Sequence, residues 1–309
     1  MRKSEIEKAL RLKEGRAVRK KNITEYFQNF SRFHREWLTE LAEKYKSRGV
    51  FPLIPMYLLP SYYSDGRDKE VAAFAALLIS DSSDFSRIQA FRKMLGERPW
   101  EWFEKREFVR LSLGREQHKR TGGVEHWKIA NLFNRLWDEC YGLTYEIPSS
   151  DTNKTLVMPI GVHVESIAKA QGCSYFDVLT YLLNDCCVGD YFYKLRLLLL
   201  VLGSSGGLGL GQWKIGREEL RCPLSSGLRT FILAWFPDYR KVCSIDEAIS
   251  LFGFESDADF FYAWLAYTEL QKSDPKACAY YSTRYTVWYG LGTRKGRHVW
   301  RGMQPKIPF

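Results

Sequence analysis

The chain has 309 residues, of which 45% are hydrophobic and 27% are charged, a balance typical of globular proteins that excludes wholesale disorder. Aromatic residues are unusually frequent at 15%, and the formal net charge of +10 favours polyanionic partners. The leucine-rich run 197–202 is far shorter than the roughly 20 residues that cross a bilayer. The N-terminus is charged and the seven cysteines are scattered, so we expect a soluble, cytoplasmic protein with reduced thiols.

Positive charge gathers at the two ends of the chain. Residues 1–21 hold nine Lys or Arg against three Glu, and residues 275–309 hold seven Lys or Arg and no acid. The sequence therefore divides into a basic N-terminal segment (1–21), a core (22–274) and a basic, aromatic C-terminal segment (275–309). The two ends are interpreted either as solubilising tails or as nucleic-acid contacts.

The core shows helical periodicity from its start. Trp37, Leu38 and Leu41 lie on one stripe of a first long helix. The segment 52–60 contains three prolines and predicts an extended or turn-rich connection. Asp68 is expected to cap the next helix, KEVAAFAALLI, which is apolar around most of its circumference and therefore predicted to be buried.

Helix signals continue along the rest of the core. In chain order they predict a helix beginning at Ser83 or Asp84, a helix near 125–140, a loop over 141–161, a helix from Ser174 and Asp177 to Cys186-Cys187, a core helix from Tyr191 to Leu202 ended by Gly203, a capping box at Ser244 and Glu247, and a helix from Ser256 and Asp259 to about Gln271. No stretch alternates as a strand would, so the predicted class is all-α.

Sequence motifs for metal sites are incomplete. His163-Val-Glu165 matches the first half of the zinc deaminase signature, in which a His binds the metal beside a general-acid Glu. The second half, Pro-Cys-x-x-Cys, is missing, no Cys-x-x-Cys occurs, and the five His are widely spread. We therefore predict no metal and no cofactor, and interpret Cys186-Cys187 as core residues.

A glycine-rich run over 206–211 follows the predicted core helix. It lacks the Gly-Lys-Ser/Thr of a phosphate loop and the strand that a dinucleotide site requires. A glycine turn between two helices exposes backbone amides that can bind a phosphate of DNA, which makes Gly207, Gly209, Gly211 and Lys214 candidate contacts. A plain flexible loop explains the same glycines.

The C-terminal segment interleaves cations with aromatic residues. Its candidate DNA contacts are Arg284, Arg294, Lys295, Arg297, Trp300 and Arg301. Arginines can bind phosphates while an aromatic face stacks on a base. Tyr281, Tyr285 and Trp288 recur at helical spacing, however, so helix packing accounts for those aromatic residues equally well.

Two blocks of the sequence resemble the helix-hairpin-helix superfamily of DNA glycosylases. The first block (66–80) contains Asp68-Lys69-Glu70-Val71-Ala72-Ala73-Phe74, and the second (195–270) contains a glycine-rich turn, Gly211-Gln212-Trp213 and Leu220-Arg221-Cys222-Pro223-Leu224. The closest likeness is to an uncharacterised bacterial branch, in which Gly-x-Trp is followed by Leu-x-x-Pro-Leu-Asp-x-His. The resemblance covers about a third of the chain.

The resemblance implies two helical lobes with a DNA-binding cleft, and a catalytic Asp after Pro-Leu. That position is Ser225, and the His two residues on is Gly227. A neutral hydroxyl cannot supply the electrostatic stabilisation of the Asp. Bifunctional members also carry a Schiff-base Lys in the hairpin, where this chain has Ser204, Ser205 and glycines. Lys214 lies about two helical turns away from that position.

The resemblance therefore implies a DNA-binding protein that recognises or acts on a base, as a degenerate glycosylase or as a base-modifying enzyme. A related phage group modifies thymine-derived bases. The alternatives are a non-catalytic nucleic-acid or protein interaction module and an enzyme of another class. A carboxylate such as Asp185, Asp190 or Glu218 in a cleft near Ser225 would favour catalysis, whereas a closed, apolar surrounding would favour the interaction module.

Overall fold

The computed structural model describes residues 35–47, 54–80, 84–142, 158–184, 191–203, 210–216, 219–225, 227–228, 231–232, 246, 249–250 and 252–273. The chain forms two compact units. The first combines Met1–Arg48 with Leu224–Phe309, and the second is Gly49–Pro223.

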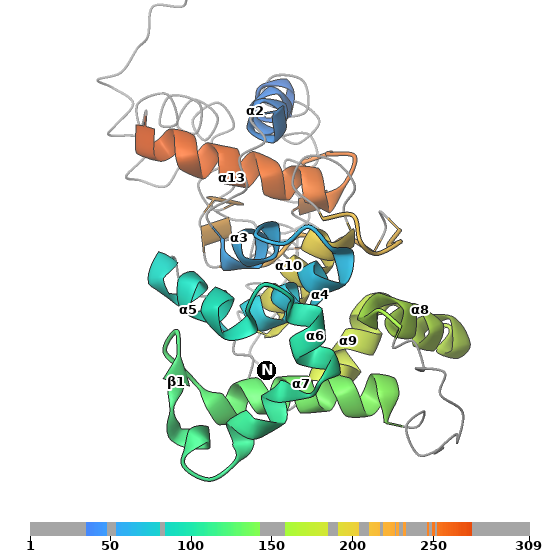
Figure 1. The fold of residues 1–309 in the computed structure, drawn as a ribbon. Helices are drawn as coiled ribbons and strands as arrows, with labels where there is room; N and C mark the ends of the chain where they lie inside the picture. Colours follow the sequence, from blue (N-terminus) through green and yellow to red (C-terminus); the bar gives the residue numbers. More distant parts are fainter. Residues whose placement is uncertain are drawn as a thin grey trace, which may run out of the picture. The chain divides into compact units, whose positions relative to one another are not determined.

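The second unit contains most of the described helices (Figure 1). They are α3 (Pro55–Ser61), α4 (Gly66–Ala76), α5 (Phe85–Leu95), α6 (Pro99–Glu104), the 3₁₀ helices η1 (Glu107–Ser112) and η2 (Glu116–His118), α7 (His126–Tyr141), α8 (Ile160–Gln171), α9 (Tyr175–Leu183) and α10 (Tyr191–Gly203). A two-residue hairpin of β1 (Arg120–Thr121) and β2 (Val124–Glu125) precedes α7.

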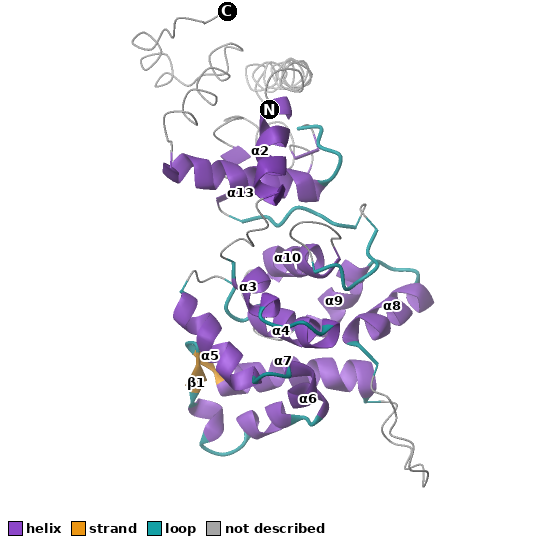
Figure 2. Ribbon diagram, turned by 45° about the horizontal axis from the view of Figure 1, so that its top comes forward, coloured by secondary structure: helices purple, strands orange, loops and turns teal. Residues whose placement is uncertain are grey.

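Helix α4 is the centre of this unit. It packs against α3, α5, α6, α8 and α10 (Figures 1 and 2). Every residue from Glu70 to Ala76 is buried, as the apolar circumference of the sequence predicts. The predicted cap is wrong: Asp65, not Asp68, is the N-cap and accepts from the backbone N–H of Arg67 at 2.8 Å. Asp68 lies in the first turn and bonds to a different helix.

Helix α3 corrects a second prediction. Its residues fall in the proline-rich segment 52–60, for which an extended connection was expected. Pro55 stands at the start of the helix, where its missing N–H has no partner to lose and its fixed φ favours the helical turn. Pro60 lies in the last turn, so only a short stretch of helix follows it.

The other helix starts agree with their sequence signals. Asp84 caps α5, and Ser174 forms a full capping box with Asp177 at the start of α9. Helix α10 ends at Gly203 as expected. Helix α9 ends at Leu183, while Cys186, Cys187 and the capping box predicted at Ser244 lie outside the described residues.

Aromatic side chains fill the space between α6, η1 and α7. Phe103 stacks on Phe108 with ring centroids 5.6 Å apart, and Trp102 meets Phe133 edge to face at 5.0 Å. Trp137 extends the cluster, 5.3 Å from Phe103. Such rings bury large apolar areas and add geometric specificity, so part of the high aromatic content serves the core.

The first unit is described mainly by α2 (Arg35–Ser47) and α13 (Asp257–Ser273), which pack against each other. Leu38 is fully buried on α2. The predicted start of α13 is confirmed, because the Ser256 hydroxyl accepts from the backbone N–H of Asp259 at 3.2 Å. Phe252 and Phe260 form an aromatic contact at 4.7 Å within this unit.

Among the described residues, 70% are helical and 2% are in strands, so the all-α class is confirmed. No helix within these residues is long and apolar enough to span a membrane.

Candidate functional site

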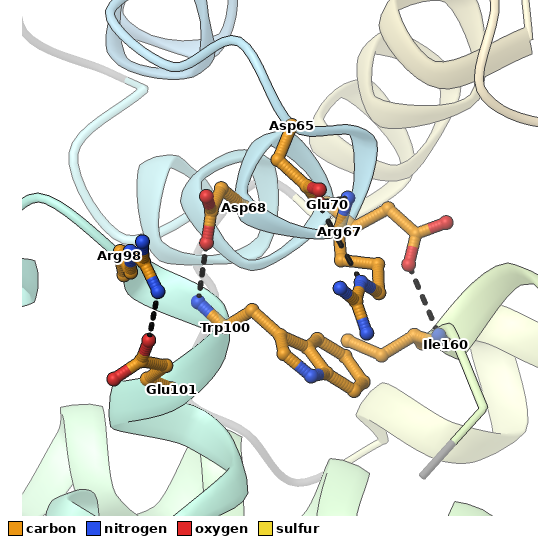
Figure 3. A network of polar contacts seen from close by, with 8 residues as sticks. All are labelled: Asp65, Arg67, Asp68, Glu70, Arg98, Trp100, Glu101 and Ile160. Atoms are coloured by element: carbon orange, nitrogen blue, oxygen red, sulfur yellow. Dashed lines mark hydrogen bonds and ion pairs between the residues drawn. The ribbon is translucent and has the colours of Figure 1, made fainter. Parts of the chain in front are cut away.

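Glu70 is a buried acid on an otherwise apolar stretch of α4. Its side chain accepts hydrogen bonds from parts of the chain that are distant in sequence. The indole N–H of Trp213 donates to Oε1 at 2.8 Å, and the backbone N–H of Ile160 donates to Oε2 at 3.0 Å (Figure 3 shows the second). One carboxyl group thus joins α4, the start of α8 and the segment 210–216.

The start of α8 requires such a partner. Its N-cap is Pro159, which has no side-chain acceptor for the free N–H groups of the first turn. Glu70 supplies the acceptor from α4, and its charge is favoured by the positive end of the helix dipole. The sequence around Pro159 contains no local capping signal, because the cap comes from 90 residues away.

Burial raises the pKa of Glu70 to about 7, because the ionised carboxylate loses its hydration. The hydrogen bonds from Trp213, Gly161 and Ile160 oppose this shift by stabilising the charged form, and the charge of Asp65 adds to it. Glu70 therefore changes charge near neutral pH, which is the range in which a carboxyl can exchange a proton with a ligand.

Trp213 is held in place on several sides. Its ring is 6.1 Å from Phe74 and 6.0 Å from Tyr175, and the residue is only 5% exposed. Its backbone N–H donates to the carbonyl of Leu202 at 2.9 Å. Gly161 permits this packing, because a Cβ at that position would overlap with the indole ring.

A cavity of about 490 Å³ opens beside Glu70. Its lining comes from the start of α4, the first turns of α8, the start of α9 and the segment 210–216. The lining residues are Asp65, Gly66, Arg67, Glu70, Pro159, Gly161, Val162, Glu165, Tyr175, Gln212, Trp213 and Lys214. This volume lies within the range of small-molecule binding sites, and the mixture of aromatic and polar groups is typical of them.

Charged groups surround the cavity. The Arg67 guanidinium lies 3.6 Å from the Asp65 carboxylate and over the ring of Trp100, 5.5 Å from its centroid (Figure 3 shows the ion pair). Glu165 pairs with Lys169, which lowers the pKa of Glu165. The exposed Lys214 side chain makes no ion pair or hydrogen bond within the described part of the chain.

Two other acids cap helices from a distance in this unit. Asp68 accepts from the backbone N–H of Trp100 in α6 at 2.8 Å (Figure 3). Glu219 accepts from the backbone N–H of Tyr175 at the start of α9, also at 2.8 Å. Acids from distant segments therefore stabilise helix starts at three places here.

The predicted DNA-contact residues are described only in part. Lys214 lines the cavity, and Gly211 is exposed with φ of +60°, a conformation that glycine adopts readily. Gly207, Gly209 and all the C-terminal candidates lie outside the described residues. The last group comprises Arg284, Arg294, Lys295, Arg297, Trp300 and Arg301.

Ser225 caps a helical turn, as its sequence position suggests. Its hydroxyl accepts from the backbone N–H of Leu228 at 3.0 Å. Ser225 belongs to the first unit, while the cavity belongs to the second. The acids considered as relocated catalytic groups, Asp185, Asp190 and Glu218, lie outside the described residues.

His163 is half-buried on α8, with its ring edge-on to Tyr141 at 4.5 Å, and burial lowers its pKa. The described residues hold no group of three or more His, Cys, Asp or Glu side chains that could bind a metal.

The role of Glu70 was not predicted, although it lies in the first block of the glycosylase resemblance and Trp213 in the second. One signal was present in the sequence, since Glu70 opens the apolar run VAAFAALLI on a helix predicted to be buried. A charged residue there needs a partner.

Comparison of the chain with protein-family models, curated proteins and solved structures finds no match.

Proposed function

We propose that this protein binds DNA and takes one unpaired base into the cavity beside Glu70. The observation that carries the proposal is the hydrogen bond between Glu70 and Trp213, which joins the two segments that resemble helix-hairpin-helix glycosylases at the wall of a cavity. Proteins that act on or inspect a base commonly extrude it into a pocket and contact its edge there.

The composition of the cavity supports this function. Tyr175 and Trp213 contribute aromatic surface, while Glu70 and Gln212 contribute groups that can bond to a base edge. A volume of about 490 Å³ leaves room for one base with its sugar, and excludes a stacked duplex. The cavity is therefore suited to a single unpaired nucleotide.

Positive charge supports the same function in a different way. Lys214 stands at the cavity with no ion-pair partner among the described residues, and the chain as a whole carries +10. Lysines and arginines bind phosphates without reading sequence. We assign the overall affinity to the basic C-terminal segment and the choice of base to the cavity.

Base excision at Ser225 is not part of the proposal, because a serine that caps a helical turn supplies no negative charge to a sugar cation. The proposed activity is recognition of a base. If the protein is an enzyme, the proposed reaction is modification of that base. A non-catalytic interaction module remains the alternative, favoured by the concentration of charge in residues 275–309.

The test is a binding screen with labelled single-stranded, duplex and base-modified DNA of equal length, with base release scored in the same tubes. We expect single-stranded DNA, or a duplex with an unpaired base, to bind more tightly than a perfect duplex. Equal binding of all forms would refute recognition of a base and favour the interaction module.

A deletion separates the two contributions. Removal of residues 292–309 should weaken binding to every DNA by a similar factor and reduce the slope of log affinity against log salt by about 0.9 for each lost contact with duplex DNA. The preference among DNA forms should survive, because it belongs to the cavity. A deletion that abolishes the preference but spares the affinity would contradict this assignment.

A further inference from the structure

The hydrogen bonding of Glu70 is incomplete on the side of the cavity. An ionised carboxylate offers about four acceptor positions. Trp213, Ile160 and Gly161 provide three N–H groups, and Glu70 bonds to no acceptor within the described residues. A neutral carboxyl would carry an O–H with no partner, while the carboxylate keeps one position unfilled. Either form can therefore make a further hydrogen bond toward the cavity that Glu70 lines.

The groups around Glu70 determine whether a ligand binds its ionised or its neutral carboxyl. All three protein groups are donors, and the start of α8 adds the positive end of a helix dipole. These favour the carboxylate, and only desolvation opposes it strongly. A ligand donor aimed at the remaining position would add a fourth bond and reduce the cost of burying the charge.

We propose that the cavity binds a ligand edge bearing an N–H donor, which completes the hydrogen bonding of the ionised Glu70 carboxylate. This inference rests on the proposed function, where the ligand is an unpaired base whose pairing edge carries N–H groups once its partner strand is removed. Glu70 is then a binding residue that selects for a free pairing edge. A base still paired in a duplex has that N–H engaged and cannot bind.

Binding of such a ligand fixes a charge that is only half formed at neutral pH, so a proton leaves the protein. Affinity should rise about tenfold between pH 6 and pH 8, because the ionised fraction of Glu70 rises by that factor around a pKa of about 7. Ordinary phosphate binding has the opposite dependence, since histidines gain charge and attract DNA as the pH falls. The sign of the effect therefore separates the two.

Other groups around Glu70 do not reproduce this dependence. Burial raises the pKa of Cys140 to about 12 and raises the pKa of Tyr141 and Tyr175, so all three stay neutral between pH 6 and pH 8. The remaining charged groups that line the cavity are Asp65, Arg67, Glu165 and Lys214. The hydrogen bond from Lys169 lowers the pKa of Glu165, so Glu165 stays ionised between pH 6 and pH 8.

The experiment is isothermal titration calorimetry of the full chain with a single-stranded 15-mer of mixed sequence. It is run at pH 7 in two buffers that differ in ionisation enthalpy, and the affinity is measured from pH 6 to pH 8. We expect release of about half a proton per complex and the tenfold rise in affinity. Glu70→Gln should remove both effects, because its amide does not titrate.

Trp213→Phe keeps the proposal testable if Glu70→Gln unfolds. Loss of the indole N–H removes a donor from Glu70, so the midpoint of the pH dependence should move to higher pH. Proton uptake, no proton linkage, or an unmoved midpoint in Trp213→Phe would overturn the inference while leaving DNA binding intact. Absence of any DNA binding would instead refute the proposed function, and this inference with it.

Discussion

The starts of α6 and α8 are capped in the same way and differ in what surrounds the cap. Neither N-cap residue, Arg98 or Pro159, makes a side-chain cap. Each helix start is satisfied by an acid of α4, Asp68 for α6 and Glu70 for α8, at 2.8 and 3.0 Å. Two acids two residues apart on one helix therefore hold two other helices in place.

The difference lies in charge compensation and in access to the cavity. Burial raises the pKa of Asp68, and the hydrogen bond from Trp100 together with the charges of Arg67 and Arg98 opposes this rise. For Glu70 the largest influences from the described residues are burial and three N–H groups, with no cation among them, and Glu70 lines the cavity. Both acids therefore cap a distant helix, but only Glu70 also lines the cavity.

The largest expected effect is on the pH dependence of stability. The pKa of Glu70 is raised from an unfolded value near 4.5 to about 7, so its contribution is fully present below pH 4.5 and is lost as the pH rises through 7. The loss amounts to about 3 kcal/mol of unfolding free energy. Urea unfolding of the wild type and of Glu70→Gln between pH 4.5 and pH 8 measures it as a difference.

That difference should shrink steadily between the two pH limits and stay constant above pH 8. Exposed acids whose pKa values are lowered by ion pairs, such as Glu101 and Glu125, cancel because both proteins contain them. A difference that does not vary with pH would mean that Glu70 keeps an ordinary pKa, and the contrast with Asp68 would fail.

The next effect concerns two glycines that line the same cavity. A Cβ at Gly161 would overlap with the buried indole of Trp213, and one at Gly66 with the Oε1 atom of Gln212. The indole is held by its hydrogen bond and cannot move freely, whereas the Gln212 side chain is exposed and flexible. We expect Gly161→Ala to cost about 2 kcal/mol and Gly66→Ala about 0.5 kcal/mol or less.

Thermal or urea unfolding of the two glycine variants under identical conditions gives the comparison, and each serves as the control of the other. Equal losses of unfolding free energy would show that the Trp213 indole moves as easily as the Gln212 side chain. The indole would then not be a rigid part of the cavity wall.

Removal of the other distant cap should have a smaller effect. Asp68→Ala leaves the backbone N–H of Trp100 without its acceptor at the start of α6, which costs about 1 kcal/mol. Because Asp68 does not line the cavity, the variant should bind DNA as the wild type does. Unfolding curves and fluorescence anisotropy check the two parts, and a selective loss of DNA binding would place Asp68 in the site after all.

The smallest effect on stability is expected for Lys214→Ala. The side chain is exposed and unpaired in the described structure, so the unfolding free energy should change by less than about 0.5 kcal/mol. The salt slope of DNA binding should fall by about 1, as for the loss of one phosphate contact. Lys93→Ala, an exposed lysine of α5 that does not line the cavity, is the matched control and should leave the slope unchanged.

Local signals in the sequence predicted much of the fold. The caps at Asp84, Ser174 and Ser256 depend on residues two or three positions away, and all three are confirmed. The prolines of 52–60 misled, because a proline at the first helical position is compatible with a helix. The cap of α4 was predicted at Asp68, three residues after the actual N-cap, Asp65.

The site could not be predicted in the same way. Glu70 and Trp213 are 143 positions apart, and nothing local in either segment indicates the other. Glu70 and Trp213 lie in the two blocks that resemble the same family, but the resemblance did not predict a contact between these two residues. A buried acid in an apolar helix was visible in the sequence, but its partners depend on how α8 and the segment 210–216 pack on α4.

The central claim, that an unpaired base enters the cavity beside Glu70, is tested most directly by filling the cavity. Val162 lines it and is 37% exposed, so Val162→Trp can occupy the space without a change of charge. Leu113→Trp, at a position 59% exposed away from the cavity, is the matched control. The measurement is the ratio of affinities for single-stranded and fully paired DNA. We predict that Val162→Trp brings this ratio close to one while Leu113→Trp retains the wild-type preference; an unchanged ratio in a folded Val162→Trp protein would contradict the account.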